Sequence, residues 1–351
     1  MTRRVGIVSF AQVTSPCERR RNEVELVIPV VQEAVAASGI PRAEIGFTCS
    51  GSCDYLYGGP FAFVSGLDAV GAWPPIRESH VEADAAWALY EAWLVIRSGE
   101  VDSALVYGFG KPSTTDAAEV LGLQADPYTV APLWPSATDL AALAASAAIA
   151  AGVLDERDMA EAAAAARRAG LTNPHAVVGE DVTADELLAR PVTHPPLRDA
   201  DLAPVTDGSV AVVLAAEELA RKVCDAPVWI TGIAHRVDTP SLGARDLTDV
   251  PSARAAAVAA GVGDGPVEVA ELAATHSHEV VLLRRALGLG PEVAVNPSGG
   301  ALVANPVMST GLIRIGEAAA GIRAGQARRA VAHAASGPAL QQNLVCVLEG
   351  D

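Results

Sequence analysis

The sequence Asn296-Pro297-Ser298-Gly299-Gly300, with Pro306 and Thr310-Gly311 after it, is the stretch that decides the fold. Two adjacent glycines soon after a proline indicate a sharp backbone turn that approaches other main chain closely, because glycine has no Cβ atom. The turn is not a phosphate-binding loop, since the lysine and the spacing of that motif are absent. We therefore expect it beside a cleft, with Ser298, Gly299 and Gly300 contacting a bound ligand.

Outward from this stretch, a strand–helix–strand pattern occurs once at each end of the chain. In both copies apolar residues recur at helical spacing between two short apolar runs, and a glycine, Gly39 or Gly261, follows the helix. A repeat at such wide spacing predicts two similar halves and not a solenoid. The predicted elements are Arg4–Phe10, Glu23–Ser38 and Glu44–Cys49 in the first copy, and Val228–Ala234, Ser252–Ala260 and Val267–Leu272 in the second.

Each half continues with another helix and a closing strand. We expect an N-terminal half at residues 1–224 with an insertion at about 111–204, and a C-terminal half at residues 225–351. The insertion is rich in Pro, Asp and Thr around two alanine-rich helices, which is typical of a segment that covers a cleft. The further predicted elements are His80–Ser98, Val101–Tyr107, Ser209–Ala215, Glu217–Val223, His278–Leu287, Ala327–Ala335 and Leu344–Glu349.

The composition excludes some classes of function. Half of the 351 residues are hydrophobic but only 4% are aromatic, so the core must be built mainly from Ala, Val and Leu. Small apolar side chains suit close-packed helices and buried strands in a layered α/β protein. The formal net charge of −17 argues against nucleic acid as the main partner.

The sequence also gives no sign of export, a membrane span or a metal site. Two arginines and a short strand open the chain, whereas a signal peptide needs a longer apolar run. The alanine-rich stretch 140–151 is too short to cross a membrane. The five scattered cysteines predict no disulfide framework, and Cys49 and Cys53 lack two further zinc ligands at suitable spacing. We expect a cytoplasmic protein in which these two thiols are buried at a strand end.

Three segments resemble the thiolase family, and the resemblance extends over nearly the whole chain. Val205–Leu214 resembles its Thr-Asp-Gly-Ala segment, Val269–Leu272 resembles the strand before its His-Asp-x-Phe motif, and Asn296–Gly311 resembles its Asn-Pro-Ser-Gly-Gly…Gly-His-Pro stretch. The resemblance implies an α/β thiolase fold with two βαβαβαββ halves in five αβαβα layers. It also implies a dimer that acts on acyl-CoA thioesters.

The departures from the family are as informative as the matches. The resemblance places the nucleophilic cysteine, which the start of a helix activates, at Ala85. It places the two catalytic histidines at Ala273 and Asn305, and the second cysteine near Ala335–Pro338, where there is none. All four catalytic positions are vacated, so the chain's own residues do not predict an acyltransferase.

Within the family, the chain resembles the lipid-transfer and sterol-carrier thiolase-like group. Some members are aldol-lyases that cleave steroid side-chain acyl-CoAs, with tyrosines at the positions that match Ala273 and Asn305, and this chain lacks those tyrosines as well. The segment Gly337–Leu348 strengthens the likeness to a short thiolase-like subunit of an actinobacterial complex. That likeness implies as partners a second thiolase-like subunit or a second copy, and an acyl-CoA-associated OB-fold protein with a zinc ribbon. It implies acyl-CoA as substrate and no cofactor.

Four polar residues are candidates for chemistry in the vacated cleft. Retro-aldol cleavage needs a base for a β-hydroxyl and donors for the thioester enolate, and His276 and His278 follow a strand end that should point into the cleft. The alternative is that the two histidines merely cap the next helix or form hydrogen bonds in the loop. Asn305 could donate to an oxyanion or simply hold its loop, and Ser309 is a further ligand-binding candidate.

Three functions therefore remain open. The first is a subunit of an aldol-lyase complex that cleaves a β-hydroxyacyl-CoA with a steroid side chain. The second is an inactive scaffold for an active thiolase-like partner, and the third is an acyl-CoA or sterol carrier. Joint substitution of His276 and His278 separates the first from the second, because only a catalytic role makes turnover depend on these side chains.

Overall fold

The structure, a computed structural model, describes residues 3–351; Met1 and Thr2, which open the N-terminal stretch considered above, lie outside the described residues. The elements before the insertion are β1 (Val5–Ser15), α1 (Glu23–Ser38), β2 (Phe47–Gly51), α2 (Asp54–Tyr57), α3 (Ala62–Val70), β3 (Glu78–Val81), α4 (Ala85–Arg97) and β4 (Ser103–Gly110). Those of the insertion are α5 (Ala117–Gly122), α6 (Ala137–Ala150), α7 (Glu156–Gly170), α8 (Ala184–Leu188), β5 (Val192–His194) and β6 (Leu197–Arg198). The remaining elements are β7 (Val205–Ala216), α9 (Glu217–Val223), β8 (Val228–Val237), α10 (Pro251–Ala260), β9 (Val269–Leu272), α11 (Ser277–Ala286), β10 (Ala294–Val295), β11 (Asn305–Pro306), α12 (Thr310–Arg323), β12 (Arg329–Ser336) and β13 (Gln342–Glu349).

The main sheet has the same strand arrangement on either side of its middle. From the centre outward the order is β1-β7-β4-β2-β3 on one side and β8-β13-β12-β9-β10 on the other. The inner strands pair antiparallel, whereas β2 with β3 and β4, and β9 with β10 and β12, pair parallel. The two halves join through β1 and β8 at only two residue pairs, Gly6 with Trp229 and Ile7 with Val228. The chain therefore consists of two similar α/β halves.

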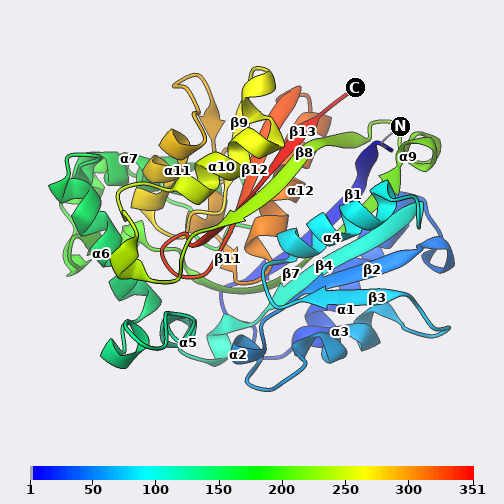
Figure 1. Cartoon of the computed structure of the whole chain (residues 1–351), viewed down its shortest axis with the longest axis horizontal. Helices are drawn as coiled ribbons and strands as arrows, with labels where there is room; N and C mark the ends of the chain where they lie inside the picture. The colour runs from blue at the N-terminus through cyan, green and yellow to red at the C-terminus, as the bar shows by residue number, and fades with distance from the viewer. Residues whose placement is uncertain (1–2) are drawn as a thin grey trace.

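Three apolar cores separate five layers. Strand residues alternate between them, so that Val210, Val212 and Leu214 of β7 face a middle core while Ala211, Val213 and Ala215 face an outer one. The middle core holds α4 and α12 between the two halves of the sheet, as Figure 1 shows. The first outer core packs α1 and α3 on the N-terminal half, and the second packs α10 and α11 with α6 and α7 on the C-terminal half. The layers are therefore α, β, α, β and α.

Most predicted elements are confirmed, and one is wrong at its start. Helices α1 and α9 have the predicted bounds, and Gly39 and Gly261 end their helices at φ of 68° and 77°, which glycine tolerates best. The helix predicted from His80 starts only at Ala85. His80 belongs instead to β3, which pairs parallel with β2 at the sheet edge.

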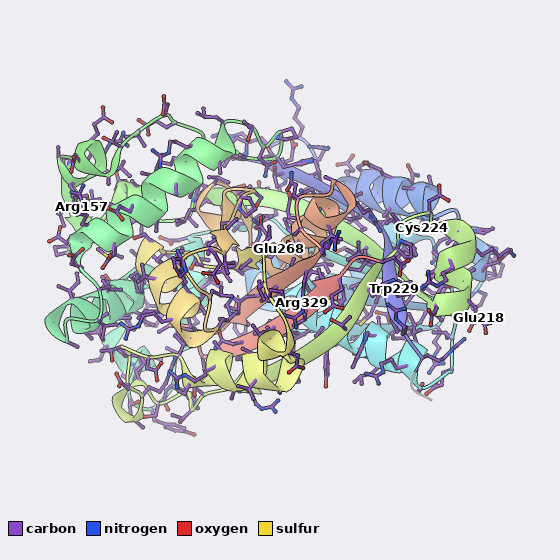
Figure 2. The ribbon with its side chains drawn as sticks, turned by 90° about the horizontal axis from the view of Figure 1, so that it is seen from above. Arg157, Glu218, Cys224, Trp229, Glu268 and Arg329 are labelled. Atoms are coloured by element: carbon purple, nitrogen blue, oxygen red, sulfur yellow. The ribbon has the colours of Figure 1, made fainter. Side chains whose placement is uncertain are left out.

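Polar contacts tie together segments of the second half that are distant in sequence. The guanidinium of Arg329, at the start of β12, donates to the carbonyl oxygens of Gly261, Val262 and Gly265 just after α10 (Figure 2). Trp229, at the start of β8, is buried, and its indole N–H donates to the Asp351 carboxylate, with 2.7 Å between Nε1 and Oδ1. We propose that the boundary between the halves lies at Cys224–Asp225, in the link from α9 to β8. Within residues 3–351, none of the helices combines the length and apolar character needed to cross a membrane.

Candidate active site

A cavity of about 130 Å³ lies where the two halves and the insertion meet. Its walls come from the starts of both middle helices, the turn between β9 and α11, the segment before α12, the link from β12 to β13, and the insertion. The lining residues used below are Asp84, Ala273, Thr275, His276, Glu279, Asn305, Met308, Thr310 and those from Ala335 to Leu340. Leu121, Gln124, Ala137 and Ala141 line it from the insertion.

The structure brings together the four positions that the resemblance singles out. Ala273, Asn305 and the residues Ala335–Pro338 line the cavity. Ala85 lies next to Asp84, is fully buried, and donates its N–H to the Met308 carbonyl at 2.9 Å. Three of the four vacated positions therefore line one cavity, and Ala85 is buried directly behind its wall residue Asp84.

Asp84 caps both middle helices at once. Its carboxylate accepts from the N–H of Ala86 in α4 at 2.9 Å, and from the N–H groups of Gly311 and Leu312 in α12 at 2.8 and 3.1 Å. Burial raises the pKa of this carboxyl, while the three N–H donors oppose that rise. Two helix N-termini thus converge on a carboxylate at the cavity wall, where the positive ends of both dipoles favour an anion.

His276 lies in the turn from β9 to α11, and Glu279 holds it. The Glu279 carboxylate accepts from the backbone N–H groups of Thr275 at 2.7 Å and His276 at 3.1 Å, which is the carboxylate half of a capping box for α11. The Nδ1 atom of His276 lies 3.3 Å from the same carboxylate. Burial would raise the pKa of Glu279, but His276 and the backbone donors outweigh it and lower that pKa to about 2. The carboxylate is therefore ionised next to the ring.

His278 is separate from the cavity. Its side chain is 1% exposed, lines a different small void, and leaves Nδ1 buried without a hydrogen bond among the described residues. Burial lowers the pKa of this imidazole to about 4, so the ring is neutral at physiological pH. Of the two candidate histidines, the structure thus brings only His276 to the cavity wall.

Asn305 lines the cavity, and its side-chain amide contacts Thr310. The Thr310 hydroxyl donates to Asn305 Oδ1 at 2.7 Å, which leaves the Nδ2 group free to donate. The backbone of Asn305 is held by parallel pairing with Val205 at the start of β7. This residue therefore presents two N–H groups to a ligand, as an oxyanion would require.

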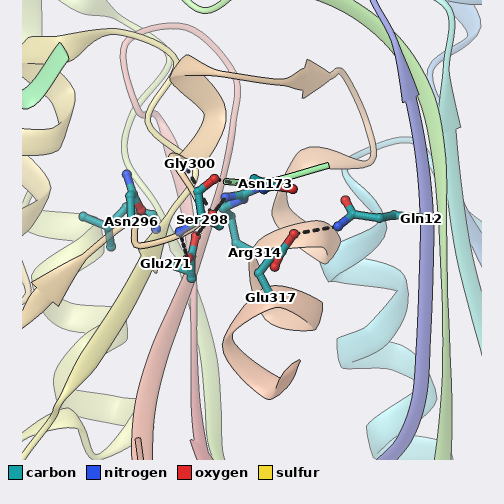
Figure 3. Close-up of polar contacts among 9 residues, drawn as sticks. Gln12, Asn173, Glu271, Asn296, Ser298, Gly300, Arg314 and Glu317 are labelled. Carbon is teal, nitrogen blue, oxygen red and sulfur yellow. Dashed lines mark hydrogen bonds and ion pairs between the residues drawn. The ribbon is translucent and has the colours of Figure 1, made fainter. Parts of the chain in front are cut away.

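The glycine turn and Ser309 lie outside the cavity wall. Ser298 sits on a buried ion pair in which Arg314 Nη1 and Glu271 Oε2 are 2.8 Å apart, and its hydroxyl contacts both side chains (Figure 3). Gly299 and Gly300 have φ of 95° and 65° and turn the chain over that pair. Ser309 is fully buried, with its hydroxyl unpaired among the described residues.

Part of the cavity wall is a loop with an unusual backbone. Ala339 and Leu340 have φ of 49° and 56°, a left-handed conformation that residues with a side chain rarely adopt. Two clamps hold the loop: the Arg245 guanidinium donates to the carbonyl oxygens of Pro338 and Ala339, and Asn343 Nδ2 donates to the Leu340 carbonyl at 2.7 Å. The surrounding structure therefore imposes this conformation.

Cys49 and Cys53 form neither a metal site nor a pair of reactive thiols. Within residues 3–351, no cluster of three or more His, Cys, Asp or Glu side chains is arranged to hold a metal ion. Cys49 and Cys53 are buried, as the sequence predicts, and burial raises the pKa of both thiols, that of Cys53 to about 11. Both are protonated at neutral pH and thus poor nucleophiles.

Sequence reasoning missed three residues of this site. For Glu279 there was a signal, because a residue three positions after His276 with a carboxylate is typical of a capping box. Thr310 stood in the quoted Thr310-Gly311 pair and Asp84 directly before Ala85, but their partners were not visible. The Asp84 contacts with Gly311 and Leu312 span 227 and 228 residues, and only the tertiary fold reveals them.

Comparison with known proteins supports the fold. No protein-family model matches the chain. An acetyl-CoA acetyltransferase of Methanothermobacter thermautotrophicus is 28% identical over 182 residues, which is 45% of this chain and 48% of that protein. The match thus spans about half the length of this curated relative.

Three solved structures match the chain along almost its whole length. They are the Ltp2-ChsH2(DUF35) aldolase (TM-score 0.82, 17% identity, 99% of this chain and 98% of the other), the acetyl-CoA acetyltransferase of Bacillus anthracis (0.79, 15%, 100% and 99%) and human mitochondrial 3-ketoacyl-CoA thiolase (0.78, 15%, 99% and 99%). Identity this low shows the fold alone. The chain has the thiolase fold.

Proposed function

We propose that this chain is a thiolase-fold subunit of an acyl-CoA-dependent aldol-lyase that cleaves a β-hydroxyacyl-CoA with a steroid side chain. The observation that carries the proposal is the content of the cavity. It holds a histidine with a carboxylate partner, His276 with Glu279, and an amide donor, Asn305, but Ala85 offers no nucleophile. A solved aldolase, Ltp2-ChsH2(DUF35), has the same fold, which makes lyase chemistry in such a scaffold a reasonable expectation.

The roles follow from the chemistry of a retro-aldol cleavage. His276 takes the proton of the β-hydroxyl group, the bond between Cα and Cβ breaks, and a ketone or aldehyde leaves. The electron pair of that bond forms the enolate of the thioester, and the Asn305 amide donates to its oxygen. Protonation of Cα by the histidinium then gives the shorter acyl-CoA and restores the base.

The size of the cavity limits which part of the substrate it receives. Its volume of about 130 Å³ is well below the roughly 300–1,000 Å³ typical of pockets that enclose a drug-sized ligand. It is enough for the reacting carbons and the thioester oxygen. We therefore place the steroid nucleus and the CoA moiety outside the cavity.

A partner chain belongs to the proposal. The fold relative Ltp2-ChsH2(DUF35) is a complex by its name, and we propose an equivalent acyl-CoA-associated partner here, with a second thiolase-like subunit or a second copy of this chain. Binding energy from such a partner would hold the parts of the substrate that the cavity leaves outside.

His276 and His278 provide a matched pair for the test. Both lie in one turn of chain, but only His276 lines the cavity. In the purified complex, His276→Gln should lower kcat for a β-hydroxyacyl-CoA by about 10²–10⁴, whereas His278→Gln should change it no more than a few-fold. Size-exclusion chromatography of both variants checks that the complex still assembles.

A scaffold is the second candidate, and the vacated Ala85 and Ala273 favour it. Under that function, His276→Gln turns over as fast as the wild type in an intact complex. Binding of acyl-CoA without turnover in any combination of partners would instead indicate a carrier. Either result contradicts the aldol-lyase proposal.

A further inference from the structure

We propose that Glu279 is the positioning residue of the site: its carboxylate holds His276 in the tautomer that carries its proton on Nδ1 and presents Nε2 to the cavity as a base. The inference rests on the proposed function for its catalytic consequence, but the tautomer itself does not depend on that function. It concerns a residue whose position in a capping box would otherwise give it only a structural role.

The position of the carboxylate is fixed by donors on one side. Oε2 accepts from the Thr275 N–H at 2.7 Å, from the His276 N–H at 3.1 Å and from the Thr275 hydroxyl at 3.2 Å. Oε1 is then left to face the imidazole of His276, 3.3 Å from Nδ1. Glu279 is 5% exposed, so protein groups make most of the contacts of its carboxylate.

Only one tautomer satisfies all of these contacts. The Thr275 hydroxyl lies 3.0 Å from Nδ1 and has a single proton. If Nδ1 carried no hydrogen, its lone pair would face the negatively charged Oε1 of Glu279, which is repulsive. With the proton on Nδ1, the ring donates to Oε1 and to the Thr275 oxygen, and the hydroxyl donates to Oε2. Within residues 3–351, every hydrogen bond of this ring is made by Nδ1, so Nε2 is left for a ligand.

A glutamine at position 279 should invert the tautomer without loss of the cap. The three donors on Oε2 require an oxygen at that position, so the amide NH₂ of the glutamine must occupy the position of Oε1. It then donates to Nδ1, which becomes an acceptor, and the imidazole proton moves to Nε2. His276 would present a donor to the cavity where the wild type presents an acceptor.

Nuclear magnetic resonance of the full chain labelled with ¹⁵N-histidine tests this directly. The chain has seven histidines, and loss of signals in His276→Gln assigns the ring. At a pH where the ring is neutral, we expect proton-bearing Nδ1 in the wild type and proton-bearing Nε2 in Glu279→Gln. In the complex, Glu279→Gln should lower kcat by about 10²–10⁴ with little change in KM.

Glu186→Gln is the matched control. Glu186 completes the same kind of capping box with Thr183 at the start of α8, and no histidine is part of that box. It should leave the His276 signals and kcat unchanged. A wild-type ring with its proton on Nε2, or an unchanged tautomer in Glu279→Gln, overturns the inference. If the tautomers are as expected but the wild-type complex cleaves no β-hydroxyacyl-CoA, the proposed function fails and the positioning by Glu279 stands.

Discussion

Replacing Asp84 by alanine removes one carboxylate from the starts of two helices at once. The N–H groups of Ala86, Gly311 and Leu312 lose their acceptor together, and all three are buried between the halves of the sheet. We expect α4 and α12, and with them the whole middle layer, to be destabilised.

The magnitude follows from the number of donors. An unpaired buried N–H costs about 1–3 kcal/mol, so three of them cost roughly 3–9 kcal/mol. The variant recovers part of this cost, because the buried carboxylate, whose pKa burial raises, no longer has to be desolvated. We therefore expect a loss of about 3–5 kcal/mol in the free energy of unfolding.

Urea unfolding followed by circular dichroism measures the loss, and Asp155→Ala is the control. Asp155 also caps a helix, α7, but it is exposed and its side chain accepts from the N–H of Asp158 alone. Loss of such a cap costs about 1 kcal/mol. Acetate, which replaces the missing carboxylate, should stabilise Asp84→Ala and leave the wild type unchanged. Equal losses in the two variants, or no response to acetate, would refute the double-cap reasoning.

Three other perturbations have definite expected outcomes. Arg314→Met should lower the free energy of unfolding by about 3–5 kcal/mol because it leaves the buried Glu271 carboxylate unpaired. Urea unfolding should show that the double variant Arg314→Met, Glu271→Gln is more stable than Arg314→Met alone. Burial lowers the pKa of His278 from 6.5 to about 4, so the folded state binds fewer protons than the unfolded state, and stability falls by roughly 3 kcal/mol as the pH drops through this range. His278→Gln should flatten that part of the pH profile, and a profile equal to that of the wild type contradicts the assignment. Ala85→Cys should react slowly with iodoacetamide because the Asp84 carboxylate disfavours a neighbouring thiolate, and the added change Asp84→Ala should speed the reaction.

The fold was predictable where local residues determine the geometry. Gly39 and Gly261 end their helices because a left-handed residue is needed there, and that need is visible in the sequence. The predicted start of the helix at His80 was wrong because residues 78–81 form β3, a four-residue strand at the sheet edge. So short a strand has too few residues to show an alternating pattern in the sequence. The length of β7 was underestimated because Val205 and Thr206 pair with β11 from a distant part of the chain.

The sequence predicted which catalytic positions are vacated, but not which side chains contact one another at the site. The motifs led to Ala273 and Asn305, which line one cavity, and to Ala85, which is buried next to its wall residue Asp84. They could not show that Ser298 serves a buried ion pair, because Arg314 and Glu271 are 43 residues apart and become partners only through packing. Periodicity also cannot separate His276 from His278, since a difference of two residues in a turn decides which side chain reaches the cavity.

The loop at Ala339 and Leu340 has an energetic consequence for the cavity. A residue with a side chain costs roughly 1–2 kcal/mol in the left-handed region, and this loop holds two in succession. Glycine at either position would remove that cost, but it would also remove a side chain that closes the cavity. The two side chains thus close this part of the cavity wall at a cost in folding stability. Because the wall is strained and held by Arg245 and Asn343, a ligand longer than the cavity would displace this loop before it separated the packed sheets.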